Sequence, residues 1–228
     1  MNALNKQLPL LVPRIACMDA FAYLQQLPSE SVDLVVTDPP YESLEKHRKR
    51  GTTTRLVNDW FETISNDTYP HLMRLLYSVL RPDSHCYIFC DAETSFIIHA
   101  AGIGAGFKFW KPLVWDKVAM GMGYHYRARY EMILFFEKGS RQLNDKTMSD
   151  ILRVKRVYHA HRSWPTEKPV ELLSMLVQQS ANRGERVMDP FMGSGSTLVA
   201  AARYGCEVWG CDLEQKAVDI TNKRLGDV

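Results

Sequence analysis

The sequence has few cysteines, and none of them stands in a metal-binding pattern. Its 228 residues include five cysteines and no CxxC pair. An odd number of cysteines in mostly apolar segments predicts buried thiols in a reducing compartment rather than a disulfide framework. The pair His159 and His161 lacks a cysteine or acidic residue at metal-ligand spacing. We therefore expect neither disulfides nor a bound metal.

Long apolar segments and an excess of charge of one sign are also missing. The longest uncharged run, 94–107, is too short to cross a bilayer. Residues 1–13 lack the basic start and apolar core of a signal peptide. The formal net charge of +2 does not by itself predict a nucleic-acid-binding protein. These absences predict a soluble, cytoplasmic protein with no membrane partner.

The pattern of apolar runs predicts one domain, 1–228, of alternating strands and helices. A chain of 228 residues with 46% hydrophobic content can bury a single core. β-branched and apolar runs bounded by turn residues predict seven strands, at 14–17, 32–37, 85–90, 107–115, 130–137, 186–189 and 207–211. Helical patterns fall at 20–27, 59–80, 93–101, 168–181, 196–204 and 213–224. This alternation is typical of a doubly wound, mostly parallel sheet.

Three features depart from regular alternation. No helical pattern separates 107–115 from 130–137, so these two strands are expected to pair antiparallel. Pro70 lies inside the 59–80 pattern and should break or kink that helix. Residues 138–165 are polar and basic with little periodicity, which predicts an inserted loop or small subdomain rather than part of the sheet.

A glycine pair follows one predicted strand and opens a helix. The run Asp189-Pro190-Phe191-Met192-Gly193-Ser194-Gly195 lies at the strand end where such sheets bind ligands. The glycines would let a ligand approach the backbone at a helix N-terminus. Leu198 replaces the third glycine of the dinucleotide fingerprint, which favours a smaller cofactor with a carboxylate. Asp212 follows the next strand, where it would accept ribose hydroxyls or cap the helix at 213–224. Phe191 is either a core residue or a wall against the cofactor.

A second motif, Asp38-Pro39-Pro40-Tyr41, follows the apolar strand at 32–37. The Asp38 carboxylate and the Pro39 carbonyl can accept the two N–H groups of an exocyclic amine, whose lone pair would then face a methyl donor. The prolines stiffen the loop, and Tyr41 can stack on a base that has left the duplex. The alternative is a proline-rich turn in which Asp38 caps and Tyr41 only packs. With the glycine motif also present, amine binding is favoured.

No cysteine in the chain follows a proline. Methylation of a ring carbon requires a cysteine nucleophile, usually in a Pro-Cys pair, so the sequence favours amine chemistry over covalent catalysis. Together the two motifs predict transfer of a methyl group from S-adenosylmethionine to a nucleobase amine.

The order of these motifs resembles the β-class S-adenosylmethionine-dependent DNA amino-methyltransferases, in which the catalytic motif precedes the cofactor loop. The resemblance spans about the whole chain. It implies a circularly permuted, Rossmann-like methyltransferase sheet of seven strands, mostly parallel with a terminal antiparallel hairpin. It further implies double-stranded DNA as partner, base flipping, and an inserted target-recognition segment at 118–163. Relatives are often dimers, so a homodimer is a further expectation.

The resemblance also implies roles for individual residues. Asp19 matches an acidic contact to the cofactor's adenine, with capping of the helix at 20–27 as the alternative. Pro165-Thr166-Glu167-Lys168-Pro169 is similar to the segment that holds the methionine end of the cofactor, although Trp164 stands where the family usually has histidine. The expected cofactor contacts are Asp19, Asp38, Thr166, Lys168, Asp189, Phe191, Gly193, Gly195, Ser196, Thr197 and Asp212. The expected catalytic residues are Asp38, Pro39, Pro40 and Tyr41.

Two further segments, Trp115-x-Lys117 and Arg129-Tyr130-Glu131, resemble the edges of the family's pocket or are ordinary strand ends. Basic residues gather in two stretches, one just after Tyr41 and one near 153–162. Each stretch alone is as well explained by a solvated loop, but a place beside the base pocket favours phosphate contacts. The expected DNA contacts are Lys46, Arg48, Lys49, Arg50, Arg55, Arg153, Lys155 and Arg156.

In this family, Asp-Pro-Pro-Tyr mostly accompanies N6-adenine targets, whereas N4-cytosine enzymes more often begin the motif with serine. We therefore expect adenine in a short DNA site as the substrate. Methylation of N4-cytosine or of an RNA base is an alternative. So is a catalytically silent nucleic-acid-binding module, against which the intact Asp38, Tyr41 and glycine pair argue.

Overall fold

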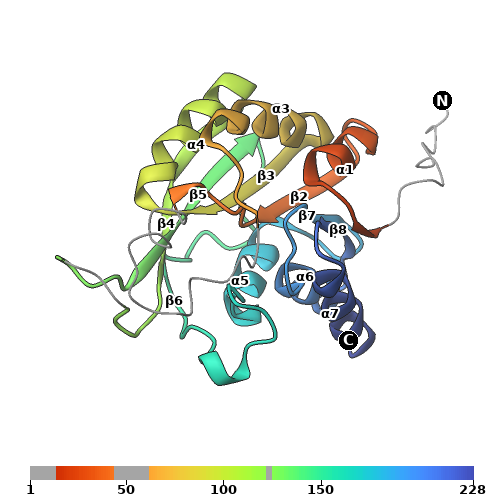
Figure 1. The fold of residues 1–228 in the computed structure, drawn as a ribbon. Helices are drawn as coiled ribbons and strands as arrows, with labels where there is room; N and C mark the ends of the chain where they lie inside the picture. The colour runs from red at the N-terminus through yellow and green to blue at the C-terminus, as the bar shows by residue number, and fades with distance from the viewer. Residues whose placement is uncertain (1–13, 44–61, 122–124) are drawn as a thin grey trace, which may run out of the picture.

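Helices cover both faces of one sheet in the computed structural model, which describes residues 14–43, 62–121 and 125–228 (Figure 1). The strands are β1 (Ile15–Cys17), β2 (Val32–Thr37), β3 (Leu80–Cys90), β4 (Lys108–Asp116), β5 (Tyr130–Lys138), β6 (Ile151–Arg153), β7 (Arg186–Asp189) and β8 (Glu207–Asp212). Helices α1 (Ala20–Gln26), α3 (Tyr69–Val79) and α4 (Ala92–Ala105) lie on one face. Helices α5 (Val170–Ser180), α6 (Ser196–Tyr204) and α7 (Gln215–Gly226) lie on the other.

The strand order within the described residues is β1-β8-β7-β2-β3-β5-β4-β6. The pairs from β1 to β3 are parallel, and β5 runs antiparallel to both β3 and β4. This confirms the predicted sheet and its antiparallel hairpin. From the β7–β2 pair the chain winds outward in both directions, since β8 lies beyond β7 and β3 lies beyond β2. Open α/β sheets bind their ligands at such a switch point, at the carboxyl ends of the strands.

One strand was not expected. The prediction that 138–165 lies outside the sheet is wrong for β6, which pairs parallel with the end of β4 and makes eight strands instead of seven. Leu152, the middle residue of β6, is buried in the core that packs against α5. The strand has three residues and only one of them is buried. A run this short cannot show periodicity in the sequence.

The helix predicted at 59–80 also begins later than expected. Residues 59–61 lie outside the described part of the chain, and a short 3-10 turn, η2 (Asn66–Thr68), precedes α3. Pro70 lies in the first turn of α3 and neither breaks nor kinks it, because an N–H at that position has no partner within the helix. A second 3-10 turn, η3 (His159–His161), lies in the segment that leads to α5.

The core explains why the central strands read as apolar runs. Every residue of β2 is buried, because side chains on its two faces enter separate cores. Val35 packs toward α3, and Leu34 and Val36 pack toward α5. Burial of each such side chain contributes about 1.5–3 kcal/mol. No helix in the described ranges is long and apolar enough to span a membrane.

Candidate active site

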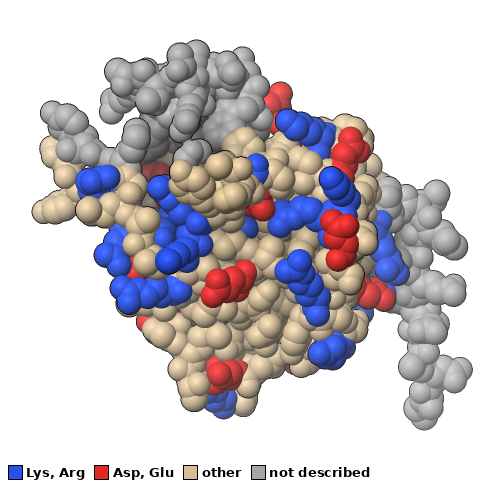
Figure 2. All heavy atoms as spheres, turned by 90° about the horizontal axis from the view of Figure 1, so that it is seen from below, with Lys and Arg blue, Asp and Glu red and all other residues tan. Residues whose placement is uncertain are grey.

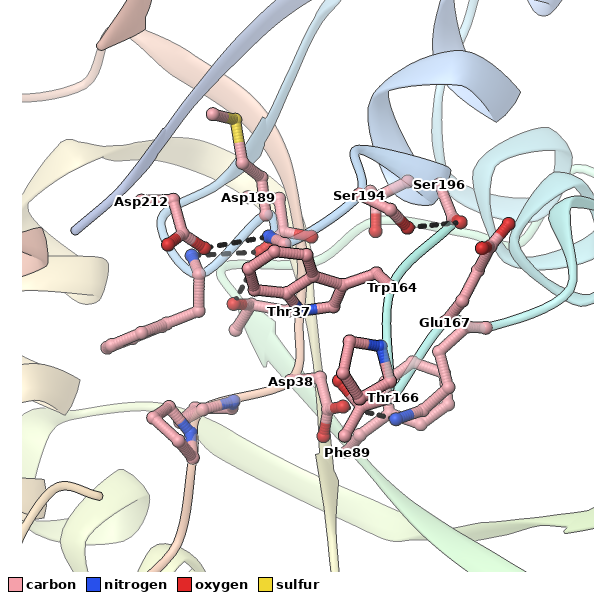
Figure 3. A pocket seen from close by; sticks show the side chains of 18 of the residues that line it. Thr37, Asp38, Phe89, Trp164, Thr166, Glu167, Asp189, Ser194, Ser196 and Asp212 are labelled. Atoms are coloured by element: carbon pink, nitrogen blue, oxygen red, sulfur yellow. Dashed lines mark hydrogen bonds and ion pairs between the residues drawn. The ribbon is translucent and has the colours of Figure 1, made fainter. Parts of the chain in front are cut away.

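A pocket of about 1510 Å³ opens at the carboxyl ends of β2, β7 and β8. Both sequence motifs face it, since neighbouring parallel strands end at the same edge of the sheet (Figure 3). All the predicted cofactor residues except Gly195 line this pocket, as do the four predicted catalytic residues. The sheet thus brings together motifs that lie far apart in the sequence: Thr37 and Asp189, which are 152 residues apart, are joined by a hydrogen bond.

The glycine loop is shaped by backbone conformation and by close packing. Gly193 and Gly195 have φ angles of +50° and +72°, which residues with a side chain rarely adopt. A Cβ on Gly193 would lie 3.1 Å from the Trp164 ring, and one on Gly195 would lie 2.6 Å from the Thr221 side chain. Protein side chains therefore occupy the space over both glycines, where the sequence had suggested an approaching ligand.

Asp189 holds this loop in place. Its buried carboxylate accepts hydrogen bonds from the Thr37 hydroxyl at 2.8 Å and from the Phe191 N–H at 3.1 Å. Burial raises the pKa of Asp189 to about 6, and the hydrogen bonds from Thr37 and Thr197 oppose that rise. Phe191 itself is half-buried and both packs on the core and lines the pocket. Ser196 accepts a hydrogen bond from Arg224 at 3.1 Å.

Two further acidic residues, Asp212 and Asp19, line the pocket. Asp212 accepts the Gly193 N–H at 2.9 Å and the Glu214 N–H at 3.0 Å. It is not the cap of the last helix, which begins two residues later than predicted, with Glu214 at the N-cap. Burial raises the pKa of Asp212. Asp19 caps α1 by accepting the Ala22 N–H at 2.9 Å, and it also lines the pocket.

Asp38 lies at the end of β2 and forms an ion pair with Lys168. The Lys168 ammonium also lies 3.1 Å from the Glu131 carboxylate, which in turn pairs with Lys117 at 2.8 Å. Burial raises the pKa of Asp38, and Lys168 opposes that rise. Burial would lower the pKa of Lys168, but its two carboxylate partners outweigh burial and raise it. Lys168 is therefore a cation at neutral pH.

The rest of the catalytic motif is tied to the segment before α3. The Pro40 carbonyl accepts the Ile64 N–H at 2.8 Å, and Tyr41 forms an isolated bridge with Ile64. Tyr41 is partly buried, and burial raises the pKa of its hydroxyl. Asp38 pairs with a cation instead of capping a helix, and in this respect the structure differs from the proline-rich turn considered above.

Trp164 lies in the middle of the site. Figure 3 shows its indole between Asp189 on one side and Asp38 with Thr166 on the other. The side chain is buried and packs over Gly193. Glu167 fixes the same segment by accepting the Ser163 N–H at 2.7 Å and pairing with Arg224 of α7 at 3.2 Å. The glycine loop and the Asp38 motif therefore meet at this ring.

The expected DNA contacts fall into two groups. Lys46, Arg48, Lys49, Arg50 and Arg55 lie outside the described residues. In the second group, Arg153 pairs with Asp116 at 3.3 Å, Lys155 is exposed, and Arg156 is exposed and lines the pocket. Figure 2 shows Lys and Arg side chains gathered on one part of the face seen from below. Their role in DNA binding stays a prediction.

Sequence reasoning missed the links between the motifs. Nothing in the sequence joins Asp38 to Lys168, which lies 130 residues away, or shows that Lys168 also contacts Glu131. Thr37 appeared only as the last residue of a strand, although its hydroxyl ties that strand to Asp189. In the described part of the chain, no group of three or more acidic, cysteine or histidine side chains could hold a metal ion.

Known proteins resemble this chain in sequence. The family model N6_N4_Mtase, described as DNA methylase, matches residues 32–223. The type II methyltransferase M2.DpnII of Streptococcus pneumoniae is 29% identical over 235 residues, which cover 91% of this chain and 87% of that protein. M.HpaI of Haemophilus parainfluenzae is 26% identical over 238 residues, which cover 93% and 74%.

Solved structures share the fold. M1.HpyAVI, solved with S-adenosylmethionine, has a TM-score of 0.69 at 21% identity and covers 92% of this chain and 98% of its own. The cytosine-N4-specific PvuII DNA methyltransferase has a TM-score of 0.71 at 14% identity and covers 93% and 92%. The chain therefore belongs to the N6_N4_Mtase family of DNA methylases and is a DNA methyltransferase that uses S-adenosylmethionine.

Proposed function

We propose that this enzyme methylates the exocyclic N6 amine of adenine in a short site of double-stranded DNA, after the base has left the duplex. The observation that carries the proposal is the position of Asp38, whose carboxylate lies in the same pocket as the glycine loop. Asp-Pro-Pro-Tyr at this position favours adenine over cytosine. The fold alone does not choose the base, because the cytosine-N4-specific PvuII enzyme shares it.

The residues around the pocket fit S-adenosylmethionine. Helix α6 begins at Ser196, and Gly195 at its N-cap provides no side-chain cap, so the first N–H groups of the helix suit the carboxylate of the methionine end. The Asp212 carboxylate accepts backbone N–H groups of Gly193 and Glu214 and lines the pocket, so it is placed to accept a ribose hydroxyl as well. Asp19 lies beyond it, where the adenine would be held, and Phe191 and Trp164 supply apolar walls.

The chemistry needs little from the protein beyond orientation. The bound cofactor supplies an electrophilic methyl group on sulfur. The Asp38 carboxylate and the Pro39 carbonyl accept the two N–H groups of the amine and so direct the nitrogen lone pair at that methyl. As the new C–N bond forms, the bond between that methyl and sulfur would break and its electron pair would stay on sulfur. The nitrogen then carries a positive charge, which makes an N–H acidic, and Asp38, being its acceptor, can take the proton. Tyr41 holds the base by stacking, and residues 118–163 and the basic residues would position the duplex.

The test is mass spectrometry of nucleosides from unmethylated DNA that has been incubated with the protein and S-adenosylmethionine. N6-methyladenine is the expected product. N4-methylcytosine in its place would overturn the choice of base while retaining the mechanism. If cofactor binding is intact but DNA stays unmodified while RNA is methylated, the substrate class is wrong.

A further inference from the structure

Four charged side chains form a chain across the floor of the pocket, and the methyl-transfer scheme uses only the first. Asp38 is followed by Lys168, Glu131 and Lys117, so negative and positive groups alternate and their charges balance. The two inner members have side chains that are only 12% exposed. Asp38 follows β2, Glu131 lies in β5 and Lys117 follows β4, three strands that the order β2-β3-β5-β4 keeps in one part of the sheet. Lys168 comes from the segment that precedes α5.

The ion pairs of Lys168 lie in surroundings that strengthen electrostatic interactions. The Lys168 ammonium lies 5.1 Å from the centre of the Phe89 ring, on the strand between β2 and β5. A charge over an apolar and largely dry surface interacts strongly with its neighbours, because little water screens it. Removal of one partner would leave the other charge buried and uncompensated.

Lys168 and the target amine need the same acceptor. The ammonium donates to the Asp38 carboxylate, which the proposed mechanism requires to accept an N–H of the base. Glu131 offers that ammonium a second acceptor 3.1 Å away. A short movement from one carboxylate to the other would therefore uncover Asp38 without placing Lys168 in an apolar environment.

We propose that Lys168 and Glu131 are positioning residues, in that Lys168 keeps the Asp38 carboxylate ionised and oriented in the free enzyme, and Glu131 receives the Lys168 ammonium when the target amine takes its place. This inference rests on the proposed amine methylation. Lys117 pairs with Glu131 from the other side and so keeps that carboxylate ionised. Burial opposes ionisation of Glu131, but Lys168 and Lys117 lower its pKa.

Other titratable groups surround Asp38, and its charge disfavours their ionisation. Burial and the Asp38 charge raise the pKa of groups in the catalytic loop, α3, the end of β3 and the end of β7, namely Tyr41, Tyr69, Cys90 and Asp189. Glu131 is the neighbouring acid whose charge opposes ionisation of Asp38. Lys168 and Lys117 are the cations whose charges favour ionisation of Asp38. The protonation state of Asp38 should therefore respond chiefly to Lys168.

The test is the pH dependence of single-turnover methyl transfer in matched variants. Lys168→Gln keeps an N–H donor but removes the charge, so the acid limb of the rate profile should move to higher pH by about one unit or more. Glu131→Gln removes a neighbouring negative charge, so the limb should move to lower pH. Its rate on the plateau should fall by about tenfold or more, because the neutral amide oxygen of glutamine is a weaker acceptor for the Lys168 ammonium than the carboxylate.

The double variant separates this role from a simple structural one. With both charges removed, the limb should return toward its wild-type position. Lys111→Gln, which breaks the exposed pair with Asp150, should leave the profile unchanged. Cofactor affinity, measured by calorimetry, should stay within about threefold in Lys111→Gln. It is also measured in the Lys168 and Glu131 variants, so that every rate profile is compared at a saturating concentration of cofactor. The inference would be overturned if the acid limb lies at the wild-type pH in both single variants. It would also be overturned if the acid limb of the double variant is displaced as far as that of Lys168→Gln.

A second readout keeps this inference distinct from the proposed reaction. Titration of ¹³C-labelled aspartate carboxyls by NMR, with Asp38→Asn for assignment, reports ionisation without any substrate. An upward shift of the Asp38 titration in Lys168→Gln supports the inference even if the wild type methylates no adenine. An unchanged titration contradicts it even if adenine methylation is confirmed. If Lys168→Gln does not fold, a downward shift in Glu131→Gln supports the inference, and no shift overturns it.

Discussion

Two aspartates at the ends of neighbouring strands have different partners and therefore different roles. Asp189 accepts hydrogen bonds from Thr37 and Phe191 and holds the glycine loop. Asp38 contacts the Lys168 ammonium, which has a second carboxylate nearby. Of these two, only Asp38 is paired with a cation that has a second acceptor, which fits the proposed role of Asp38 as acceptor for a substrate amine.

Tyr41 is expected to hold the flipped base through its ring. Tyr41→Ala should weaken capture of the base by about 1–3 kcal/mol, the usual contribution of base stacking on an aromatic side chain. Tyr41→Phe keeps the ring and should behave as the wild type. Fluorescence of 2-aminopurine placed in the DNA site measures flipping. Equal signals from the Ala and Phe variants would show that Tyr41 only packs.

Gly195 is required by packing as well as by its backbone angle. Gly195→Ala should lower the free energy of unfolding by about 2 kcal/mol or more, because it adds contact with Thr221 to the strain of a positive φ. Gly184 has a φ of +83°, but a Cβ at that position would have no neighbouring atom within 4 Å, so Gly184→Ala tests the angle alone. Urea unfolding measures both. Equal losses would contradict a packing role for Gly195.

At the scale of elements, the sequence predicts best the strands with several buried apolar residues in a row and a motif directly after them. The runs at 32–37 and 186–189 are of this kind: every residue of the first is buried, and only Arg186 of the second is partly exposed. Strand β6 is not recognisable, since its place depends on pairing with β4 and only Leu152 is buried. The start of α3 was missed because Pro70 suggests a break and marks the first turn instead.

Strand β6 should contribute to stability through Leu152. Leu152→Ala should cost about 2–5 kcal/mol, the usual effect of truncating a buried leucine. The neighbouring Ile151 is 57% exposed, so Ile151→Ala serves as the matched control and should cost far less. Thermal or urea unfolding distinguishes the two. Similar small effects would mean that β6 is not packed on the core.

For the whole molecule, topology assembles the site. Strands β7 and β2 are parallel neighbours, so the motifs that follow them lie at the same edge of the sheet. The motif order and the strand pattern suffice to predict this edge. The charge chain from Asp38 to Lys117 could not be predicted, because it depends on side chains from segments whose spacing in the sequence carries no period. The expected homodimer, domain limits and cytoplasmic location stay predictions.

The basic residues at the end of β6 and just after it should contribute unequally to binding of DNA phosphates. Lys155 and Arg156 are exposed, whereas Arg153 is paired with Asp116, which also binds Arg129 at 2.9 Å. Lys155→Gln and Arg156→Gln should each reduce the salt dependence of DNA binding by about one unit in the slope of log K against log salt. Arg153→Gln should change the slope less. Filter binding across salt concentrations measures these slopes. Unchanged slopes for all three variants would mean that the segment is a solvated loop that does not contact DNA.

The central claim is that the Asp38 carboxylate acts on the target amine and does not hold the cofactor. It is tested most directly by comparing Asp38→Asn with the wild type for both S-adenosylmethionine affinity and single-turnover methyl transfer to DNA. The account predicts a cofactor affinity within about threefold of the wild type and a transfer rate lower by about 100-fold or more. A variant that transfers methyl groups at a near wild-type rate, or that loses activity only because the cofactor no longer binds, would contradict it.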